Sequence, residues 1–290
     1  MVKFYISTDS GCDMPKTFFQ ERNIAVIPMK YLIGEEEFID TMDPVGSKAF
    51  FDKMRAGAVA RTTQINAEDY IALWEPLLEH QLPIVHISLS SGISGTYDNG
   101  IVARKQFLEA HPEAQVFVVD GLNASMGYGL LLDRAADMRD EGKTAEECVQ
   151  WLEDNRLFVN SWYTPEDLKY LHRGGRVSAT SAVIGTMLDI KPILNVDDLG
   201  RLIAREKVKG RKKALRRMSE IVEEKVINPQ EQTLYICHAD CLEDAHALAE
   251  TINNKLHFQR IFFSDMGPII GAHTGPGLIT LFFLGQKRYR

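Results

Sequence analysis

The sequence predicts an α/β protein with two domains, and three observations support this fold class. Apolar runs of strand length alternate with helical patterns through residues 1–158, which indicates a mostly parallel sheet with helices on both faces. The second half differs, because a hairpin signal at 197–200 lies between two of its strand patterns. A chain of 290 residues is long enough for two ordinary domains. We therefore expect an N-terminal α/β domain over 1–158 and a second α/β domain over 159–290, whose last strand is also compatible with the first sheet.

Helix caps and apolar periodicity place the elements of the first half. Asp43-Pro44 has the pattern of an N-cap followed by proline at the first helical position, and Thr144 with Glu147 has that of a capping box. The expected strands are 3–7, 84–89, 115–119 and 24–32, the last as one strand or as a pair broken at Pro28. The expected helices follow Pro15 and cover 44–54, 67–79, 101–110, the segment after 129 up to 140, and 145–155, while 61–64 is a polar loop.

The second half mixes strands, helices and glycine turns. We expect strands at 158–163, 192–196, 201–205, 233–237, 260–263 and 278–284. Helices are expected at 165–171, 178–189, 242–253 and in the segment that ends near 226. The segment 267–277 is rich in glycine and proline, which predicts irregular backbone around His273.

Composition excludes several classes of protein. A hydrophobic fraction of 45% and a charged fraction of 25% are typical of soluble globular proteins, and no apolar run is long enough to cross a bilayer. We find no signal peptide and too few cysteines for a disulfide framework, so we expect a cytoplasmic protein. The net charge of −7 disfavours nucleic-acid binding. Residues 205–217 nevertheless hold eight basic residues and one acidic residue, which form either a solvated helix face or a docking surface for an anionic partner.

The strongest single signal is the turn Ser90-Ser91-Gly92-Ile93-Ser94-Gly95-Thr96-Tyr97, which joins a buried strand to a helix. A helix start leaves backbone N–H groups unpaired, and these groups together with the helix dipole favour an anion. The glycines allow a close approach to such a ligand, and Ser94 and Thr96 add hydroxyl groups that can bond a carboxylate or a phosphate. The alternative is an ordinary N-cap with a tight turn and no ligand.

The same turn also permits an enzymatic hypothesis. Gly92-Ile93-Ser94-Gly95-Thr96 nearly matches the nucleophile elbow G-x-S-x-G, with threonine in the last position. Asp265 and His273 follow in the order of an α/β-hydrolase. A serine acyl hydrolase that uses Ser94 with His273 is therefore the alternative function, and a structural role is the alternative for His273.

Metal and nucleotide sites are weakly supported. Cys237-His238-Ala239-Asp240-Cys241 has no second cysteine pair, so we expect no zinc site. Neither G-x-G-x-x-G after the first strand nor G-x-x-x-x-G-K-[ST] is present, so we expect no nucleotide cofactor. Apolar residues in or near the polar turns are either ordinary core or the wall of a pocket for an alkyl chain: Ile93, Met126, Tyr128, Ile184, Met187, Leu188 and Ile270. Each CH₂ group buried in such a pocket would contribute about 0.8 kcal/mol.

Taken together, these segments resemble the DegV family of bacterial fatty-acid-binding proteins nearly from end to end. The resemblance depends on Thr8 to Asp13, Arg61-Thr62-Thr63-Gln64, Ser90 to Tyr97, Asp120 to Gly129, Leu168 to Val177, Lys191-Pro192-Ile193-Leu194 and Gly267 to Gly277. It implies a two-domain α/β fold with one long-chain fatty acid in a tunnel between the domains. It also implies that the protein is not an enzyme and presents its ligand to a fatty-acid kinase, which makes acyl phosphate for phospholipid synthesis.

The resemblance assigns roles to particular residues. The carboxylate would be held by Thr62 and Ser94, with free N–H groups around Gly95 and with His273 close by. The acyl chain would contact Ile93, Met126, Ile184, Met187, Leu188 and Ile270. Arg173, Arg176, Lys209 and Arg211 are candidates for the kinase-facing surface. Apart from the bound fatty acid we expect no cofactor and no stable membrane insertion, and we expect a monomer.

The chain departs from the family pattern at two positions. The family's T-S-Q is Thr62-Thr63-Gln64 here, which keeps a hydroxyl group at the changed position. The family's Arg-Thr is Lys209-Gly210 here, and lysine keeps the charge without the bidentate geometry of a guanidinium group.

Overall fold

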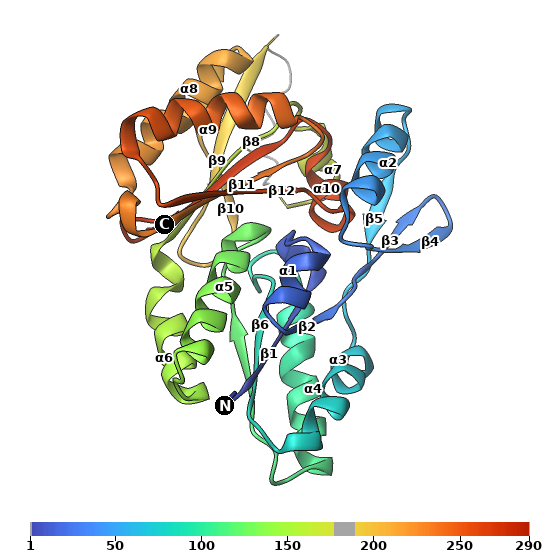
Figure 1. Ribbon diagram of the computed structural model, residues 1–290. Coiled ribbons are helices and arrows are strands. Elements are labelled where there is room, and N and C mark those ends of the chain that lie inside the picture. The colour runs from blue at the N-terminus through green and yellow to red at the C-terminus, as the bar shows by residue number, and fades with distance from the viewer. Residues whose placement is uncertain (1, 177–188, 290) are drawn as a thin grey trace.

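The first lobe is built on a four-stranded sheet whose strands are all parallel, in the order β2-β1-β6-β7. The computed structural model describes residues 2–176 and 189–289, and the first lobe lies below the second in Figure 1. Its strands are β1 (Tyr5–Asp9), β2 (Ile24–Ile27), β6 (Ile84–Ser88) and β7 (Val116–Asp120). Its helices are η1 (Ser10–Cys12), α1 (Lys16–Glu21), α3 (Ala67–Trp74), η2 (Glu75–His80), α4 (Thr96–Ala110), α5 (Met126–Asp140), α6 (Ala145–Asn155) and η3 (Arg156–Phe158).

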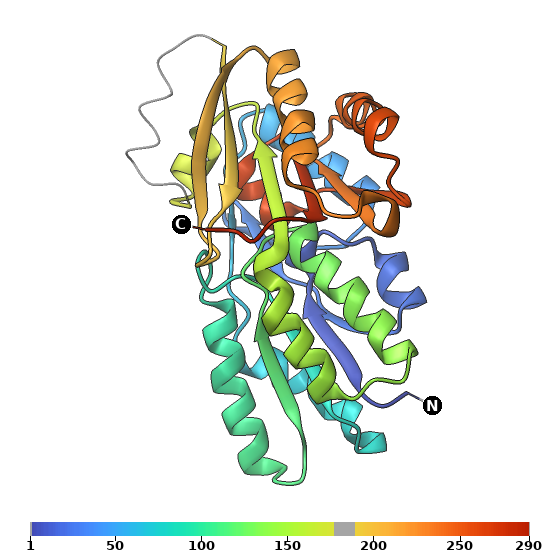
Figure 2. The same ribbon diagram turned by 90° about the vertical axis from the view of Figure 1, so that its left-hand side faces the viewer.

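Both faces of this sheet are buried, as the apolar strand patterns predicted. Successive side chains of a strand point to opposite faces, so Ile84 packs with residues of α3 and α4 while Val85 packs with residues of α5 and α6. Figure 2 shows these helix pairs on the two sides of the strands. The turns after β1, β6 and β7 therefore lie at one edge of the sheet, where parallel α/β sheets bind their ligands.

The second lobe contains a six-stranded sheet in the order β10-β9-β8-β13-β11-β12. Only β11 and β12 are parallel within it. The sequence left open whether the last strand returns to the first sheet. In the structure this strand, β13, belongs to the second sheet and lies between β8 and β11. The strands are β8 (Val159–Thr164), β9 (Ile190–Val196), β10 (Leu202–Lys209), β11 (Thr233–His238), β12 (Arg260–Asp265) and β13 (Ile279–Leu284). The helices are α7 (Lys169–Arg173), α8 (Arg211–Lys225), η5 (Pro229–Glu231), α9 (Leu242–Leu256) and α10 (Pro268–Thr274).

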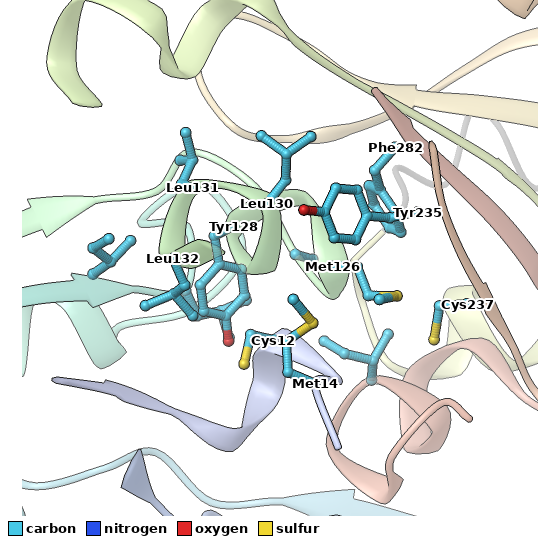
Figure 3. Close-up of a cluster of buried hydrophobic side chains, with 14 of the residues drawn as sticks. Cys12, Met14, Met126, Tyr128, Leu130, Leu131, Leu132, Tyr235, Cys237 and Phe282 are labelled. Carbon is cyan, nitrogen blue, oxygen red and sulfur yellow. The ribbon is translucent and has the colours of Figure 1, made fainter. Parts of the chain in front are cut away.

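The two lobes share a core. One face of the six-stranded sheet is covered by α8 and α9, and the other face packs on α5 of the first lobe. Figure 3 shows Met126 at the start of α5 between the η1 segment and the side chains of Cys237 and Phe282. This apolar contact between the lobes is continuous. The edge of the first sheet that carries the turns after β1, β6 and β7 therefore lies against the second lobe.

A small antiparallel sheet joins the lobes on one side. It consists of β3 (Lys30–Ile33), β4 (Glu36–Ile39) and β5 (Ala60–Thr62), in the order β4-β3-β5, followed along the chain from β4 by α2 (Pro44–Arg55). Although it belongs to the first half of the sequence, this unit packs against α10 and stands beside it in Figure 1. An ion pair between Arg55 and Asp240 also connects α2 with the second lobe.

Several expected boundaries were wrong, for local reasons. The helix after the central turn begins at Thr96 rather than at residue 101. Its N-cap is Gly95, which provides no side-chain cap, and Ser94 Oγ accepts the Thr96 N–H at 3.2 Å just before the helix. The expected loop at 61–64 begins with the end of β5, where Thr62 pairs with Tyr31. The segment around His273 is not irregular but forms α10, which ends at Gly275 with φ 77°.

Other expectations concern α7 and its surroundings. This helix covers residues 169–173, later in the chain than the expected 165–171. The helix expected at 178–189 falls almost entirely outside the described residues. The hairpin predicted at 197–200 is confirmed, because β9 and β10 pair in antiparallel fashion on either side of it. In the described part of the chain, no helix combines the length and the apolar character needed to cross a membrane.

Candidate functional site

A cavity of about 160 Å³ lies where the edge of the parallel sheet meets the second lobe and the small sheet. Most of its wall is apolar, with side chains from both lobes, among them Leu89, Ile93, Tyr163, Leu171, Leu202 and Ile270. Polar side chains also reach it, from the Thr62 and Ser94 segments, Arg176 and α10: Thr62, Thr63, Gln64, Ser94, Arg176 and His273. An apolar pocket with a few polar groups is the usual form of a site for a small amphipathic ligand.

Thr62 and His273 meet at the wall of this cavity. Thr62 is the last residue of β5, and α10 brings His273 to it, so that Thr62 Oγ1 and His273 Nε2 are hydrogen-bonded at 2.9 Å. Burial, together with the smaller effect of the positive charge of Arg176, lowers the pKa of His273 to about 4. The imidazole is therefore neutral at pH 7, and its two ring nitrogens provide one donor and one acceptor.

Ser94 lies in the turn between β6 and α4. The turn is closed by the Ser94 N–H, which donates to Ser90 O at 3.1 Å, and Ser94 Oγ is within 2.9 Å of Thr96 Oγ1. Gly95 has a packing role: a Cβ at this position would lie 2.9 Å from the side-chain amide of Gln64. Gly95 therefore lets Gln64 approach the turn, and it is not itself among the described residues that line the cavity.

The β9–β10 hairpin closes over the same turn. Ser90 Oγ donates to Gly200 O at 2.9 Å and accepts from the Gly92 N–H at 3.0 Å. A Cβ on Gly92 would collide with the carbonyl oxygen of Leu199 and would lie 2.7 Å from the carbonyl carbon of Gly200. Glycine at 92 is therefore required by the close approach of the hairpin backbone, which also forms part of the cavity wall at Gly200.

The structure separates the predicted chain-lining residues. Ile93 and Ile270 line the cavity. Met126 does not: it is buried in the shared core beneath the second sheet (Figure 3). The other three predicted residues, Ile184, Met187 and Leu188, lie outside the described residues.

Sequence reasoning missed some lining residues. Tyr163 is a cavity residue that the sequence placed in a strand but not in a site. Gln64 was visible in the motif that contains Thr62, although no role was assigned to it. Arg176 was expected to face a partner, and the structure also places it on the cavity wall.

A second depression of about 450 Å³ lies on the other side of Thr62 and His273. Thr62, Arg176 and His273 line both spaces, and Arg61 and Arg173 line only the outer one. The outer depression therefore holds three arginines around the two polar residues that also face the inner cavity. Such a cluster of guanidinium groups favours anions that carry several oxygens.

The other two basic candidates lie elsewhere, at the junction of β10 and α8. Lys209 is the exposed last residue of β10. Arg211 begins α8 and is engaged within the chain, because its Nε donates to Asp244 at 2.9 Å and its Nη1 donates to Thr164 O at 3.2 Å. Neither residue lines the cavity or the outer depression.

The residues of the hydrolase hypothesis do not form a triad. His273 bonds Thr62, Ser94 Oγ bonds within its own turn, and Asp265 lies 3.9 Å from His238. The Ser94–His273 and His273–Asp265 hydrogen bonds that a triad needs are not formed, although all three residues are described. Within residues 2–176 and 189–289, no three His, Cys, Asp or Glu side chains are placed to hold a metal ion.

Comparison with known proteins identifies the family. A family model described as "Uncharacterised protein, DegV family" matches residues 3–286. A DegV domain-containing protein of Clostridium perfringens is 39% identical over 289 residues, with 99% of each chain covered. A Thermus thermophilus structure described as "Fatty Acid Binding of a DegV family Protein" has a TM-score of 0.87 at 26% identity, covering 98% of this chain and all of that one. A Bacillus subtilis structure described as "DegV, a fatty acid binding protein" has a TM-score of 0.85 at 27% identity, covering 99% of this chain and 100% of the other.

Proposed function

Because this chain belongs to the DegV family, we propose that it binds one long-chain fatty acid in the cavity between its lobes and presents the carboxylate to a fatty-acid kinase. The observation that carries the proposal is the composition of one cavity wall: apolar side chains from both lobes together with Thr62, Ser94 and His273. An alkyl chain gains free energy for each CH₂ group that it buries, and its carboxylate needs donors at the polar part of the wall.

The polar groups have distinct roles in this proposal. The hydroxyl groups of Thr62 and Ser94 donate to the carboxylate, since each has an O–H that can turn from its present partner to a stronger, charged acceptor. Neutral His273 accepts from or donates to Thr62 and so fixes the direction of that hydroxyl group. Arg176, which is exposed and lines the cavity, attracts the carboxylate to this end.

The outer depression supports the presentation of the ligand to a kinase. A carboxylate held by Thr62 would lie one side chain away from a space that contains Arg61, Arg173 and Arg176. A phosphoryl donor brought by a kinase carries charged oxygens that these guanidinium groups can bind. In this proposal Arg173 and Arg176 form the nearer part of the kinase-facing surface, while Lys209 and Arg211 belong to a second basic segment at the start of α8.

Extraction of the purified protein with organic solvent, followed by mass spectrometry, tests the ligand. We expect a free fatty acid in the extract at about one molecule per chain. The same preparation should not hydrolyse an aryl ester above the background rate. Ester turnover that is abolished in Ser94→Ala but kept in Ser91→Ala would favour the hydrolase and contradict the carrier, because Ser91 lies in the same turn and is not among the residues that line the cavity.

A reconstituted assay tests the partner. A purified fatty-acid kinase, ATP and the lipid-loaded protein should give acyl phosphate, and omission of the protein should abolish the product. Arg173→Ala should lower the rate of formation while the affinity for fatty acid stays unchanged, because Arg173 lines only the outer depression. Equal rates for Arg173→Ala and the unmodified protein would remove Arg173 from the kinase-facing surface.

A further inference from the structure

Asp13 is a buried carboxyl group for which the proposed function gives no role. It follows η1 in the turn after β1 and has φ 53°, a left-handed conformation that aspartate tolerates better than most residues. Only 4% of the residue is exposed. Its neighbours Cys12 and Met14 belong to the apolar cluster between the lobes that Figure 3 shows. Asp13 itself lines a small cavity of about 140 Å³ together with Asp40 and Asp265.

Asp13 contacts three residues of the second lobe. Its Oδ1 accepts the N–H of Gly267 at 2.9 Å, and its backbone carbonyl accepts from Ser264 Oγ at 2.6 Å. Its Oδ2 is 3.9 Å from the Cys237 thiol, which donates to it. One residue of the first lobe thereby contacts β11, β12 and the residue that precedes α10.

The contact with Gly267 fixes the start of a helix that forms the cavity wall. Gly267 is the N-cap of α10, and α10 is only seven residues long. Ile270 and His273 of this helix line the cavity, and His273 bonds Thr62. At a rise of about 1.5 Å per residue, the N-cap and His273 are about 9 Å apart, so a shift at one end of this helix is transmitted to the other.

We propose that Asp13 is a positioning residue for the lipid site: by clamping Gly267 it holds α10 in the place where His273 meets Thr62. The proposal rests on the proposed function for its ligand. The role assigned to Asp13 is indirect, since Asp13 is not among the described residues that line the cavity.

The charge state of Asp13 selects the test variant. Asp40 is also buried, and a Cβ on Gly267 would lie 3.2 Å from Asp13 Oδ1 and 3.3 Å from Asp40 Oδ2, so the two carboxyl groups face the same backbone. Burial raises the pKa of Asp13 well above its ordinary value, and the charge of Asp40 raises it further. A protonated aspartic acid and an asparagine have the same shape and both keep an oxygen acceptor, so Asn is the conservative replacement.

The experiment measures palmitate affinity and, in the ligand-free protein, the ¹⁵N resonances of the His273 ring. We expect Asp13→Ala to weaken palmitate binding about tenfold and to shift the His273 resonances, whereas Asp13→Asn should stay within about threefold of the unmodified protein. The double variant Asp13→Ala with His273→Ala should bind no more weakly than His273→Ala alone, because both changes remove the same contact. His273→Ala also assigns the resonances, which come from one of eight histidines.

Three results would overturn the proposal. They are unchanged His273 resonances in Asp13→Ala, His273 resonances in Asp13→Asn that are shifted as far as those in Asp13→Ala, and losses of affinity that add in full in the double variant. If Asp13→Ala does not fold, Ser264→Ala removes the bond to the Asp13 carbonyl and should move the same resonances by a smaller amount, and no movement would again contradict the proposal. A protein that binds no palmitate in any form would refute the proposed function, while the His273 resonances would still decide the role of Asp13.

Discussion

The turns after β1 and β6 lie side by side at the same edge of the parallel sheet and are used differently. The turn after β6 presents Ser94 to the cavity. The turn after β1 is buried, and its carboxyl groups are satisfied within the protein: Asp9 accepts from Tyr128 at 2.7 Å and from the Leu89 N–H at 3.2 Å, and Asp13 accepts from Gly267. Equivalent positions in a sheet therefore do not imply equivalent roles. What distinguishes the two turns is whether their polar groups still have bonding capacity for a ligand.

Removing the hydroxyl groups at the cavity wall should have the largest effect. We expect Thr62→Ala combined with Ser94→Ala to lower fatty-acid affinity by at least about 100-fold, because each hydrogen bond to a charged group contributes about 1.5–3 kcal/mol. Isothermal titration calorimetry with a long-chain fatty acid measures this change. The thermal unfolding midpoint should stay close to that of the unmodified protein, since both side chains are only partly buried. Unchanged affinity would show that the turn after β6 is no more a ligand site than the turn after β1.

Asp40 is buried beside Asp13 and faces the same Gly267 backbone, so its replacement tests how buried carboxyl groups behave near the turn after β1. Burial raises the pKa of Asp40 from 3.8 to about 6, so the folded state binds the proton more tightly than the unfolded chain does. The contribution of Asp40 to stability is therefore complete below pH 3.8 and is lost as the pH rises through 6. Asp40→Asn does not lose this contribution. The difference between its free energy of unfolding and that of the unmodified protein should therefore shift in favour of the variant by up to about 3 kcal/mol between pH 4 and pH 7. Urea unfolding across this range measures the difference, and parallel pH profiles would contradict it.

Gly92 tests how closely the second lobe holds the turn after β6. A Cβ at this position meets the backbone of Leu199 and Gly200, which cannot move aside without moving the hairpin. Gly92→Ala should therefore cost about 2 kcal/mol of stability and should also weaken lipid binding, since Gly200 forms part of the cavity wall. Thermal unfolding and titration of the same sample measure both effects. An unchanged thermal unfolding midpoint in Gly92→Ala would mean that the β9–β10 hairpin can move away from residue 92 without loss of stability.

The sequence was sufficient for features that depend on local patterns. Continuous apolar runs predicted the buried parallel strands, and Asp43 and Thr144 were recognised as caps that the structure confirms. The hairpin at 197–200 was predicted because its residue types favour a tight turn. Each of these signals is complete within a few consecutive residues.

Features that join distant segments were not predictable in this way. The bond between Thr62 and His273 spans 211 positions, and the family resemblance brought both residues to one site without indicating that they contact each other. The strand pair broken at Pro28 is confirmed as β2 and β3, but the small sheet that contains β3 was missed. Glu36 and Glu37 give β4 a polar pattern, and the packing of this sheet on α10 depends on contacts across the lobes. The tether from Asp13 to Gly267 is of the same kind, since an acidic turn residue carries no local sign of its partner.

Ser91 should show the smallest effect and gives the comparison its internal control. It lies three positions before Ser94 in the same turn, but its hydroxyl group donates to Asp120 Oδ2 at 2.5 Å and its N–H donates to Asp120 Oδ1 at 3.2 Å. Ser91→Ala removes one hydrogen bond to the buried carboxylate of Asp120, which keeps its bonds to the N–H groups of Ser91 and Leu122. It should therefore cost about 1.5 kcal/mol of stability and leave fatty-acid affinity unchanged. Matched titrations of Ser91→Ala and Ser94→Ala measure the contrast. Equal losses of affinity would mean that the conformation of the turn, rather than the Ser94 hydroxyl group, determines binding.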